Sequence, residues 1–419
     1  MHSTRPTARW GMATLAVLAT SALLLSGCSS TPAEEDGPVT IEYFNFTAGA
    51  DHADKLQAIV DAFEEENPNI TIEVSNASFD DYFTQLQTRI AGNTAPDTFE
   101  LNYENFVSFA ASGALLDLEA AGSSIDAEKF FPRAFDAFNY DGIQYGLPES
   151  FSDVVLYYNK DLFDAAGVEY PNESWTWVEE AAAAEKLTDL ANGVYGEYQP
   201  VQFFEFFKTL AQSGGEFFND DLTEATFNSD AGVQAGEWLV NKVGDTMPTV
   251  AQMGGKGDDL LFKEGKIAMW HTGIWMFNAL ATEPANWDIA VEPGNTTRAS
   301  HFFANAAVAS ATTDSPTAAG KWLQFLAGSD ETVKQRLEGE WELPAVFDDS
   351  LLAPYLAKSP PESRHVVFDA LEAVVVPPVI ERQQELQDIV TLALEKAVQG
   401  EMTVKEALDD AVNQVNALL

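Results

Sequence analysis

Three strand-and-helix segments in succession constrain the fold of this chain more than any other feature. A period-two pattern with one apolar face over 39–44 predicts a strand, and helical spacing follows over 56–66 until Asn67-Pro68. The same pattern begins again near residue 70 and near residue 98. Each segment therefore takes about 30 residues, the length of a βαβ unit. We expect an α/β fold whose first strands are largely parallel.

The remaining chain continues as an α/β sequence without repeats. Val154–Tyr158 is an uninterrupted apolar run, typical of a strand buried on both faces. Further strands are predicted over 267–270 and 300–310, a helix over 316–326, and a last helix opened by a capping box at Thr403. A length of 419 residues suggests two domains or one large one. No linker longer than a few residues follows Pro38, so two lobes must be joined by short crossings.

The charge excludes several functions. Asp and Glu number 66 against 22 Lys and Arg, a net charge of −44. Nucleic acids and anionic membrane surfaces both require a basic protein surface, so neither is a plausible partner for the body of the chain. The hydrophobic share of 46% supplies material for packed cores, so the acidic composition does not indicate disorder.

The N-terminus predicts export and lipid attachment. Residues 1–27 have a short basic start and an apolar stretch too short to span a membrane, as in a secretory signal peptide. Cys28, the only cysteine, follows Leu25-Ser26-Gly27 as in a bacterial lipobox; a free thiol after an ordinary signal peptide is the alternative. Residues 28–37 then form a lipidated tether. We expect an extracytoplasmic protein, lipid-anchored to the outer face of the bacterial cell membrane and touching the membrane only through that anchor.

Several segments in a fixed order resemble a known family, the solute-binding lipoproteins of bacterial ABC importers, in particular extracellular solute-binding family 1, whose members include maltose-binding proteins. The resemblance covers nearly the whole mature chain. The segments that carry it are Phe63-Glu64-Glu65-Glu66-Asn67-Pro68, Ile90-Ala91-Gly92 with Ala95-Pro96-Asp97, Ser112-Gly113-Ala114-Leu115, Gly146-Leu147-Pro148, Tyr158-Asn159-Lys160-Asp161-Leu162-Phe163, Phe262-Lys263-Glu264-Gly265-Lys266-Ile267-Ala268-Met269 with Gly273-Ile274-Trp275, and Leu343-Pro344-Ala345.

The resemblance implies a two-lobed, periplasmic-binding-protein-like fold of type II with a ligand cleft between the lobes. Mapped onto this chain, the first α/β lobe takes 38–149 plus 294–342 and the second takes 150–293 plus 343–419. It also implies that a sugar or oligosaccharide is captured by hinge closure and delivered to the transmembrane subunits of an ABC permease. We expect a monomer without a cofactor.

Sugars present hydroxyls and flat C–H faces, so their sites combine polar side chains with aromatic rings. Trp275 matches the family position at which an aromatic ring stacks on the sugar, although a core tryptophan is the alternative. Phe204 matches a cleft aromatic but lies in a cluster of four phenylalanines that could equally be core. Phe303 and Trp341 lie on segments that return to the cleft in the family.

Polar candidates follow the predicted strands and the crossing between lobes. Loops at the carboxyl ends of strands border the crevice in open α/β sheets, and any single carboxylate here could instead be a solvated surface charge. The polar candidates are Asn45, Asp51, Asn102, Glu104, Ser152 and Asp153. The family often carries aromatics in its penultimate helix, where this chain has glutamines over 383–387. The pocket should therefore be more polar on that side, and the family's maltose specificity is not carried over.

Other chemistries fit less well. A polyamine or other cationic solute is the second ligand class, because aromatic rings and carboxylates also hold ammonium groups. A secreted glycosidase would need an isolated pair of carboxylates, and none stands out. The five histidines lack metal-ligand spacing, Gly254–Gly257 reads as a loop rather than a phosphate-binding motif, and no nucleophile has a catalytic context. We therefore expect a binding protein rather than an enzyme, with no metal.

Overall fold

The fold is described from a computed structural model. It describes residues 37–419 except 50–51, 121–125, 282–285, 347–348 and 378. The predicted signal peptide and lipid-acceptor Cys28 lie outside these residues, as does the candidate ligand-binding residue Asp51.

The first section of the sheet consists of the three predicted strands. β1 (Val39–Asn45) lies between β2 (Ile70–Asn76) and β3 (Thr98–Asn102), and both pairings are parallel. The connecting helices are α1 (Ala53–Glu66), α2 (Phe79–Ala91) and α3 (Tyr103–Ala111). The predicted parallel βαβ arrangement is therefore confirmed.

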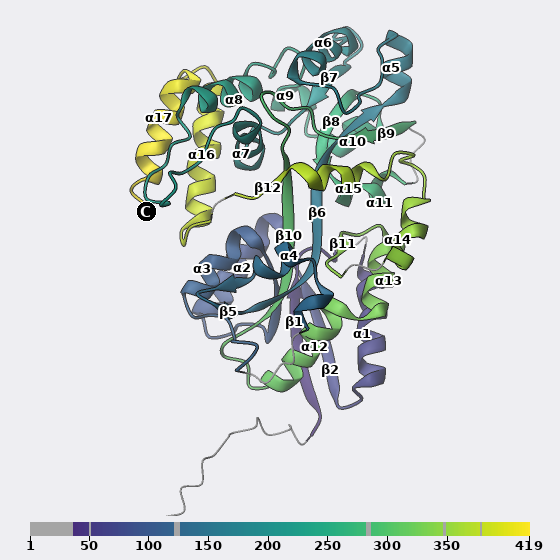
Figure 1. The fold of residues 1–419 in the computed structure, drawn as a ribbon, viewed down its shortest axis with the longest axis vertical. Helices are drawn as coiled ribbons and strands as arrows, with labels where there is room; N and C mark the ends of the chain where they lie inside the picture. Colours follow the sequence, from purple (N-terminus) through teal and green to yellow (C-terminus); the bar gives the residue numbers. More distant parts are fainter. Residues whose placement is uncertain (1–36, 50–51, 121–125, 282–285, 347–348, 378) are drawn as a thin grey trace, which may run out of the picture. The chain divides into compact units, whose positions relative to one another are not determined.

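Two long strands join the first section of the sheet to the second. In β6 (Gly146–Asn159), residues up to Asp153 pair antiparallel with β10 (Ser300–Ala309). Residues from Val154 onward pair with β8 (Ile267–Gly273) and β9 (Trp287–Ala290). The predicted buried run 154–158 is thus only the second half of β6. β10 also pairs antiparallel with β3 and β8 pairs with β7 (Tyr195–Tyr198), so the strand order runs β2-β1-β3-β10-β6-β8-β7 (Figure 1).

The second section of the sheet is surrounded by short helices. Its strands are β7 (Tyr195–Tyr198), β8 (Ile267–Gly273) and β9 (Trp287–Ala290). The helices between β6 and β9 are α5 (Lys160–Ala166), α6 (Trp177–Leu187), α7 (Phe203–Gln212), α8 (Asp230–Val240), α9 (Val250–Met253), α10 (Asp258–Lys263) and α11 (Phe277–Leu280). Residues 254–257 form a loop between α9 and α10, as predicted.

Alternating side chains place a hydrophobic core on each face of the first section. Tyr43 of β1 packs with α1 and with α12 (Pro316–Gly328), whereas its neighbour Phe44 packs on the opposite face with α2 and α3. Ala307 and Ala306 of β10 divide between the same two cores. The period of two along each strand is what supplies apolar side chains to both cores.

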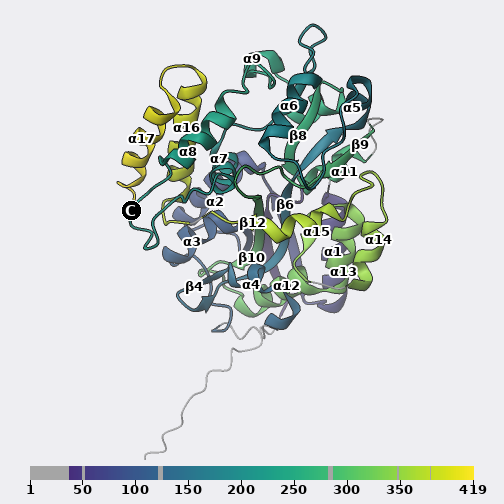
Figure 2. The same cartoon turned by 45° about the horizontal axis from the view of Figure 1, so that its top comes forward.

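The C-terminal part of the chain adds helices around both sections. α16 (Gln383–Val398) and α17 (Val404–Val415) pack against each other and against α7 and α8 (Figures 1 and 2). Thr403 and Glu406 form the predicted capping box. The remaining elements are α4 (Pro132–Asp136), β4 (Asn139–Tyr140), β5 (Ile143–Gln144), α13 (Asp330–Gly339), β11 (Leu343–Pro344), α14 (Asp349–Leu356), α15 (Val366–Ala370) and β12 (Val374–Val375).

Candidate ligand-binding cavity

A cavity of about 530 Å³ lies where loops of the first section meet the second section. Its size suits a small organic ligand, for which cavities of roughly 300–1,000 Å³ are usual. Six of the ten predicted ligand-binding residues line it: Asn102, Ser152, Phe204, Trp275, Phe303 and Trp341. Its other walls are Phe46, Thr47, His52, Phe79, Val154, Pro200, Gln202, Glu205, Asp258, His271, Thr272, Asn305 and Glu342.

Trp275 offers an accessible aromatic face to this cavity. It lies in the short 3₁₀ turn that follows β8, and 36% of the residue is exposed. Its indole folds back over Gly273, where a Cβ atom would lie only 1.9 Å from Cζ3 of the ring. Glycine at position 273 is therefore required for the orientation of Trp275, because no other residue leaves room for the indole.

Phe303 is the centre of an aromatic group beside Trp275. Its ring centroid lies 5.5 Å from that of Trp275 and 5.6 Å from that of Phe204, both in edge-to-face geometry. On its other side His301 stacks on it at 4.1 Å. Nε2 of His301 lies 3.4 Å from a carboxylate oxygen of Glu104, which is fully buried and does not line the cavity. Glu104 thus acts on the cavity only through His301 and Phe303.

Trp341 contributes to the cavity as a wall rather than as a stacking face. His52 stacks on one side with ring centroids 5.1 Å apart and nearly parallel planes. The guanidinium of Arg336 lies 4.2 Å from the centroid of the same ring. With only 3% of the residue exposed, Trp341 has no free face for a ligand.

Several polar atoms line the cavity with hydrogen-bonding capacity to spare. Oγ of Ser152 is buried and has no partner among the described residues. One carboxylate oxygen of Glu342 accepts hydrogen bonds from Ser150 Oγ and from Asn305 Nδ2, the latter at 2.7 Å. Asn102 caps α3 by accepting from the Asn105 amide, which fixes its side chain at the edge of the cavity. A buried donor or acceptor without a partner is costly, so these atoms favour a polar ligand.

Two predicted polar residues are described but do not line the cavity. Asn45 is fully buried and bonds to the carbonyl of Ser75 and the amide of Ala48, which shapes the turn carrying Phe46 and Thr47 into the wall. Asp153 is fully buried at the point where β6 changes partners, and neither carboxylate oxygen has a hydrogen-bond partner among the described residues. Burial raises the pKa of Asp153 well above its usual value, because the charged carboxylate loses its hydration there; the site therefore favours the neutral carboxyl group.

A closed ring of seven buried side chains lies directly behind Glu205 and His271. The ring runs through Lys242, Glu180, His271, Glu292, Lys208, Glu205 and Gln199, and Gln199 closes it onto Lys242. The distances between successive partners lie from 2.7 to 3.1 Å. Every member therefore has at least two partners, the condition under which buried charges are tolerated. We call this set the charge ring.

The charge ring keeps His271 cationic. Burial by itself would lower the pKa of His271, but the carboxylates of Glu292 and Glu180 on its two nitrogens raise that pKa to about 9. Burial would raise the pKa of Glu292, yet His271 and Lys208 lower it to about 2. At neutral pH the cavity wall therefore carries the imidazolium of His271, and the ammonium group of Lys208 bonds to Glu205 of that wall without lining the cavity.

Five ionisable residues of the cavity wall were not among the predicted site residues: His52, Glu205, Asp258, His271 and Glu342. Three of them had a local signal, since each directly follows a predicted site residue: His52 follows Asp51, Glu205 follows Phe204 and Glu342 follows Trp341. His271 and Asp258 had none, because their partners are distant in sequence; His271 and Glu180 are 91 residues apart.

Two members of the charge ring, together with the neighbouring Glu197, have the composition of a metal site. Glu180, Glu197 and His271 each offer a ligand atom within 4.8 Å of the others. Nζ of Lys242, however, already bonds to Glu180 at 3.1 Å and to Glu197. An ammonium group thus occupies the position where a cation would bind, and a metal ion would have to displace it.

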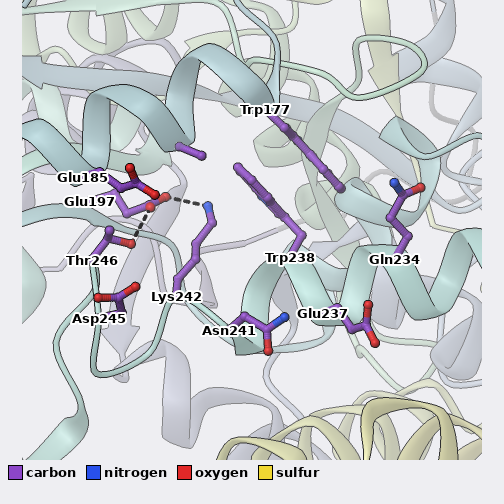
Figure 3. Close-up of a pocket in the computed structure, with 11 residues that line it drawn as sticks. Trp177, Glu185, Glu197, Gln234, Glu237, Trp238, Asn241, Lys242, Asp245 and Thr246 are labelled. Atoms are coloured by element: carbon purple, nitrogen blue, oxygen red, sulfur yellow. Dashed lines mark hydrogen bonds and ion pairs between the residues drawn. The ribbon is translucent and has the colours of Figure 1, made fainter.

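A second cavity of about 340 Å³ lies between α6 and α8 (Figure 3). Trp177 and Trp238 stack there with centroids 4.4 Å apart, and Nζ of Lys242 lies 3.7 Å from the centroid of Trp238. Both faces of the Trp238 ring are therefore covered, as the parallel indoles and the lysine in Figure 3 show. This cavity offers no free ring for a sugar.

In the described part of the chain, no helix is long and apolar enough to cross a membrane.

Comparison with known proteins agrees with this architecture. The model of the bacterial extracellular solute-binding protein family matches residues 49–333, and the chain belongs to that family. Members of the family are binding proteins. A maltodextrin-binding protein of Bacillus subtilis (strain 168) is 24% identical over 415 residues, which cover 96% of each chain.

Solved structures share the fold. An ABC substrate-binding protein from Listeria monocytogenes in complex with cycloalternan is 45% identical, with a TM-score of 0.88 over 91% of this chain and 98% of that one. A cyclic α-maltosyl-1,6-maltose binding protein from Arthrobacter globiformis is 24% identical, with a TM-score of 0.75 over 91% and 99%. The fold is that of the type II periplasmic sugar-binding proteins, as predicted.

Proposed function

We propose that this chain is the sugar-binding subunit of an ABC importer and that its cavity holds an uncharged oligosaccharide. The observation that carries the proposal is the combination of an accessible indole at Trp275 with unpaired or partly paired oxygens at Ser152 and Glu342 in one cavity. An aromatic face packs on the C–H face of a sugar, while hydroxyl and carboxylate oxygens bind its hydroxyls. The 45% identical Listeria protein, solved with cycloalternan, supports a glucose oligosaccharide as the ligand.

The charges in the cavity favour a neutral ligand over a polyamine. Three acids line the wall, Glu205, Asp258 and Glu342, and no lysine or arginine is among the lining residues. Taken alone, this composition would favour a cationic ligand. However, Lys208 bonds to Glu205 at 2.8 Å, and burial raises the pKa of Asp258. The imidazolium of His271 adds a positive charge to the same wall. A polycation would therefore meet little uncompensated negative charge.

The proposed capture step is a hinge closure at the strands that cross between sections. The change of partners in β6 after Asp153 lies near the predicted boundary at residue 150. We assign 38–149 plus 294–342 to one lobe and 150–293 plus 343–419 to the other. Closure around the sugar would present a two-lobed surface to the permease.

The proposed location is outside the cytoplasm, at the outer face of the membrane. The family match to extracellular solute-binding proteins supports export. The sequence around Cys28 supports lipid attachment, and residues 28–37 supply the tether. We propose that the protein acts as a monomer, with the permease and the sugar as its partners, and that it catalyses no reaction.

Calorimetric titration and thermal unfolding of the purified protein test the ligand class. We expect cycloalternan or linear glucose oligosaccharides to bind and to raise the melting temperature, because a ligand that binds only the folded state stabilises it. Spermidine and putrescine serve as the competing ligands. Stabilisation by the polyamines alone would refute the sugar assignment, and hydrolysis of the oligosaccharide during the titration would refute the binding class.

A further inference from the structure

A third cavity, of about 370 Å³, adjoins the aromatic cavity and differs from it in chemistry. The two cavities share Phe79, Asn102, Gln202 and Phe204. The third cavity lies between α2 and α3 on one side and α7 and α16 on the other. The two sides are in contact where Ser108 of α3 donates to the carbonyl of Glu381, two residues before α16. Within the second side, the Phe203 amide of α7 donates to Oγ1 of Thr391 of α16 at 3.1 Å.

Its wall consists mainly of carboxamides. We call it the amide cavity and define it by Gln87, Asn102, Asn105, Gln202, Gln384 and Gln387, with hydroxyls from Thr84 and Thr391 and rings from Phe79, Phe83, Phe203 and Phe204. Asp388 is the only ionisable residue that lines it among the described residues, and its carboxylate already accepts from Gln384 Nε2 at 2.9 Å. The amide cavity is therefore polar but nearly uncharged.

One of these amides is buried without a partner. Gln387 is only 8% exposed, and its Nε2 has no hydrogen-bond partner among the described residues. A buried N–H group left unsatisfied costs free energy, so its presence in a cavity wall indicates that a ligand acceptor or water completes it. Asn105, only 3% exposed on the facing side, donates to Asn102 Oδ1 at 2.9 Å, which leaves its own oxygen available as an acceptor.

The chemistry of the amide cavity matches a hydroxyl-rich, uncharged chain. Each carboxamide offers two donor hydrogens and an acceptor oxygen, and each sugar hydroxyl both donates and accepts. No cation or unpaired carboxylate in the described wall would select a charged ligand. Phe204 lies in both cavities, so a ligand that covers its ring would have units on either side of it.

We propose that the amide cavity is a second subsite that selects oligosaccharides over single sugars. The inference rests on the proposed function: the aromatic cavity holds one end of the ligand by stacking on Trp275, and the amide cavity holds further sugar units by hydrogen bonds from Gln387 and its neighbours. Gln384 and Gln387 belong to α16, while Asn102 and Asn105 lie at the start of α3, so a long ligand in the amide cavity would bond to both lobes. No residue of α16 lines the aromatic cavity, so a single sugar held there would not contact α16.

The test is calorimetric titration of wild type and Gln387→Leu with glucose, maltose, maltotriose, maltotetraose and cycloalternan. Leucine keeps the size of the side chain and removes its hydrogen bonds. We expect the affinity for the four-unit sugars to fall about 3- to 10-fold, the effect of one or two hydrogen bonds, while the affinity for glucose stays unchanged. Gln87→Leu, on the opposite and exposed wall, should give a smaller loss with the same length dependence, and it tests the subsite even if Gln387→Leu does not fold.

Gln383→Leu is the matched control. Gln383 is on the same helix, is fully buried and also has an unpartnered Nε2, but it does not line the amide cavity. It should lower the melting temperature without any dependence on sugar length. Equal affinity losses for glucose and for the four-unit sugars, or no loss for either in both cavity variants, would overturn the subsite while leaving the proposed function intact. If no sugar of the series binds to wild type, the proposed function and the subsite both fail.

Discussion

Replacing Trp275 by alanine should remove a large part of the ligand affinity while leaving the fold intact. A tryptophan side chain offers roughly 250 Å² of surface, and 36% of Trp275 is exposed in the cavity. A sugar ring covering most of that surface would bury about 90 Å², which at ~25 cal/mol per Å² is about 2 kcal/mol. Since about 1.4 kcal/mol corresponds to a tenfold change, we expect the Kd of the oligosaccharide to rise about 30-fold.

The assay is calorimetric titration of wild type, Trp275→Ala and Trp275→Phe with cycloalternan and maltotetraose. Trp275→Phe retains a ring over Gly273 and should lose less than half of the binding free energy that alanine loses. Thermal unfolding without ligand serves as the control, because it measures any stability lost with the contacts of the indole to Phe303 and Gly273. Unchanged affinity in Trp275→Ala would show that the indole does not contact the ligand and would refute the placement of the sugar.

Further outcomes follow from the same geometry. Gly273→Ala should weaken oligosaccharide binding about tenfold or more in titration, because its Cβ would lie 1.9 Å from the Trp275 ring; wild-type affinity would show that the indole has another position available. The pKa of His271 is raised from 6.5 to about 9, so its charged form stabilises the fold fully below pH 6.5, and this stabilisation is lost as the pH rises through 9. In urea unfolding, the free energy of unfolding of wild type should fall by about 3 kcal/mol across this pH range. The same pH dependence in His271→Gln would contradict the assignment. Asp153 also has a raised pKa, so its contribution is present below its ordinary pKa and declines as the pH rises; Asp153→Asn should therefore be more stable than wild type at pH 8 and similar to it at pH 4, and an equal difference at both pH values would contradict the buried neutral carboxyl.

Sequence patterns predicted correctly those strands and helices whose formation depends on residues close together in the chain. The strands of the first section follow from alternation, and the last helix from its capping box, because each depends on residues close in sequence. The first half of β6 was not predicted as a strand. Residues 146–153 contain Gly, Pro and several polar side chains, and they form a strand only because β10, some 150 residues later, pairs with them.

In the candidate site, the aromatic residues were predicted correctly, whereas the carboxylates that face the cavity were not. Aromatic residues such as Phe204, Trp275 and Phe303 were found through ordered family segments, and all three line the cavity. Whether a given carboxylate faces the cavity depends on its distant partners, which no local pattern encodes. Glu104 lies behind His301, while Glu342 reaches the cavity wall because Ser150 and Asn305 hold it there. Their roles as ligand contacts stay predictions until the titrations are done.

The polar character of the cleft near α16 was predicted by comparing the glutamines over 383–387 with the aromatics that the family often carries in its penultimate helix. The absence of aromatic residues over 383–387 indicated a more polar side. The structure places Gln384 and Gln387 in the amide cavity, but Gln383 and Leu386 point elsewhere. Positions three apart lie on one face of a helix, which explains why Gln384 and Gln387 line the cavity together.

The charge ring has a consequence for how such a protein can change over evolution. Lys208 neutralises two of its members at once, so a substitution at Lys208 alone would leave Glu205 and Glu292 buried without their shared cation, which costs about 3–5 kcal/mol. That is a large fraction of the stability of a domain. Acceptable paths therefore pass through paired replacements, such as loss of Lys208 together with one of its acids. The side chains behind the cavity should then change together, in steps, while the aromatic residues in front of them remain free to vary one at a time as the preferred sugar changes.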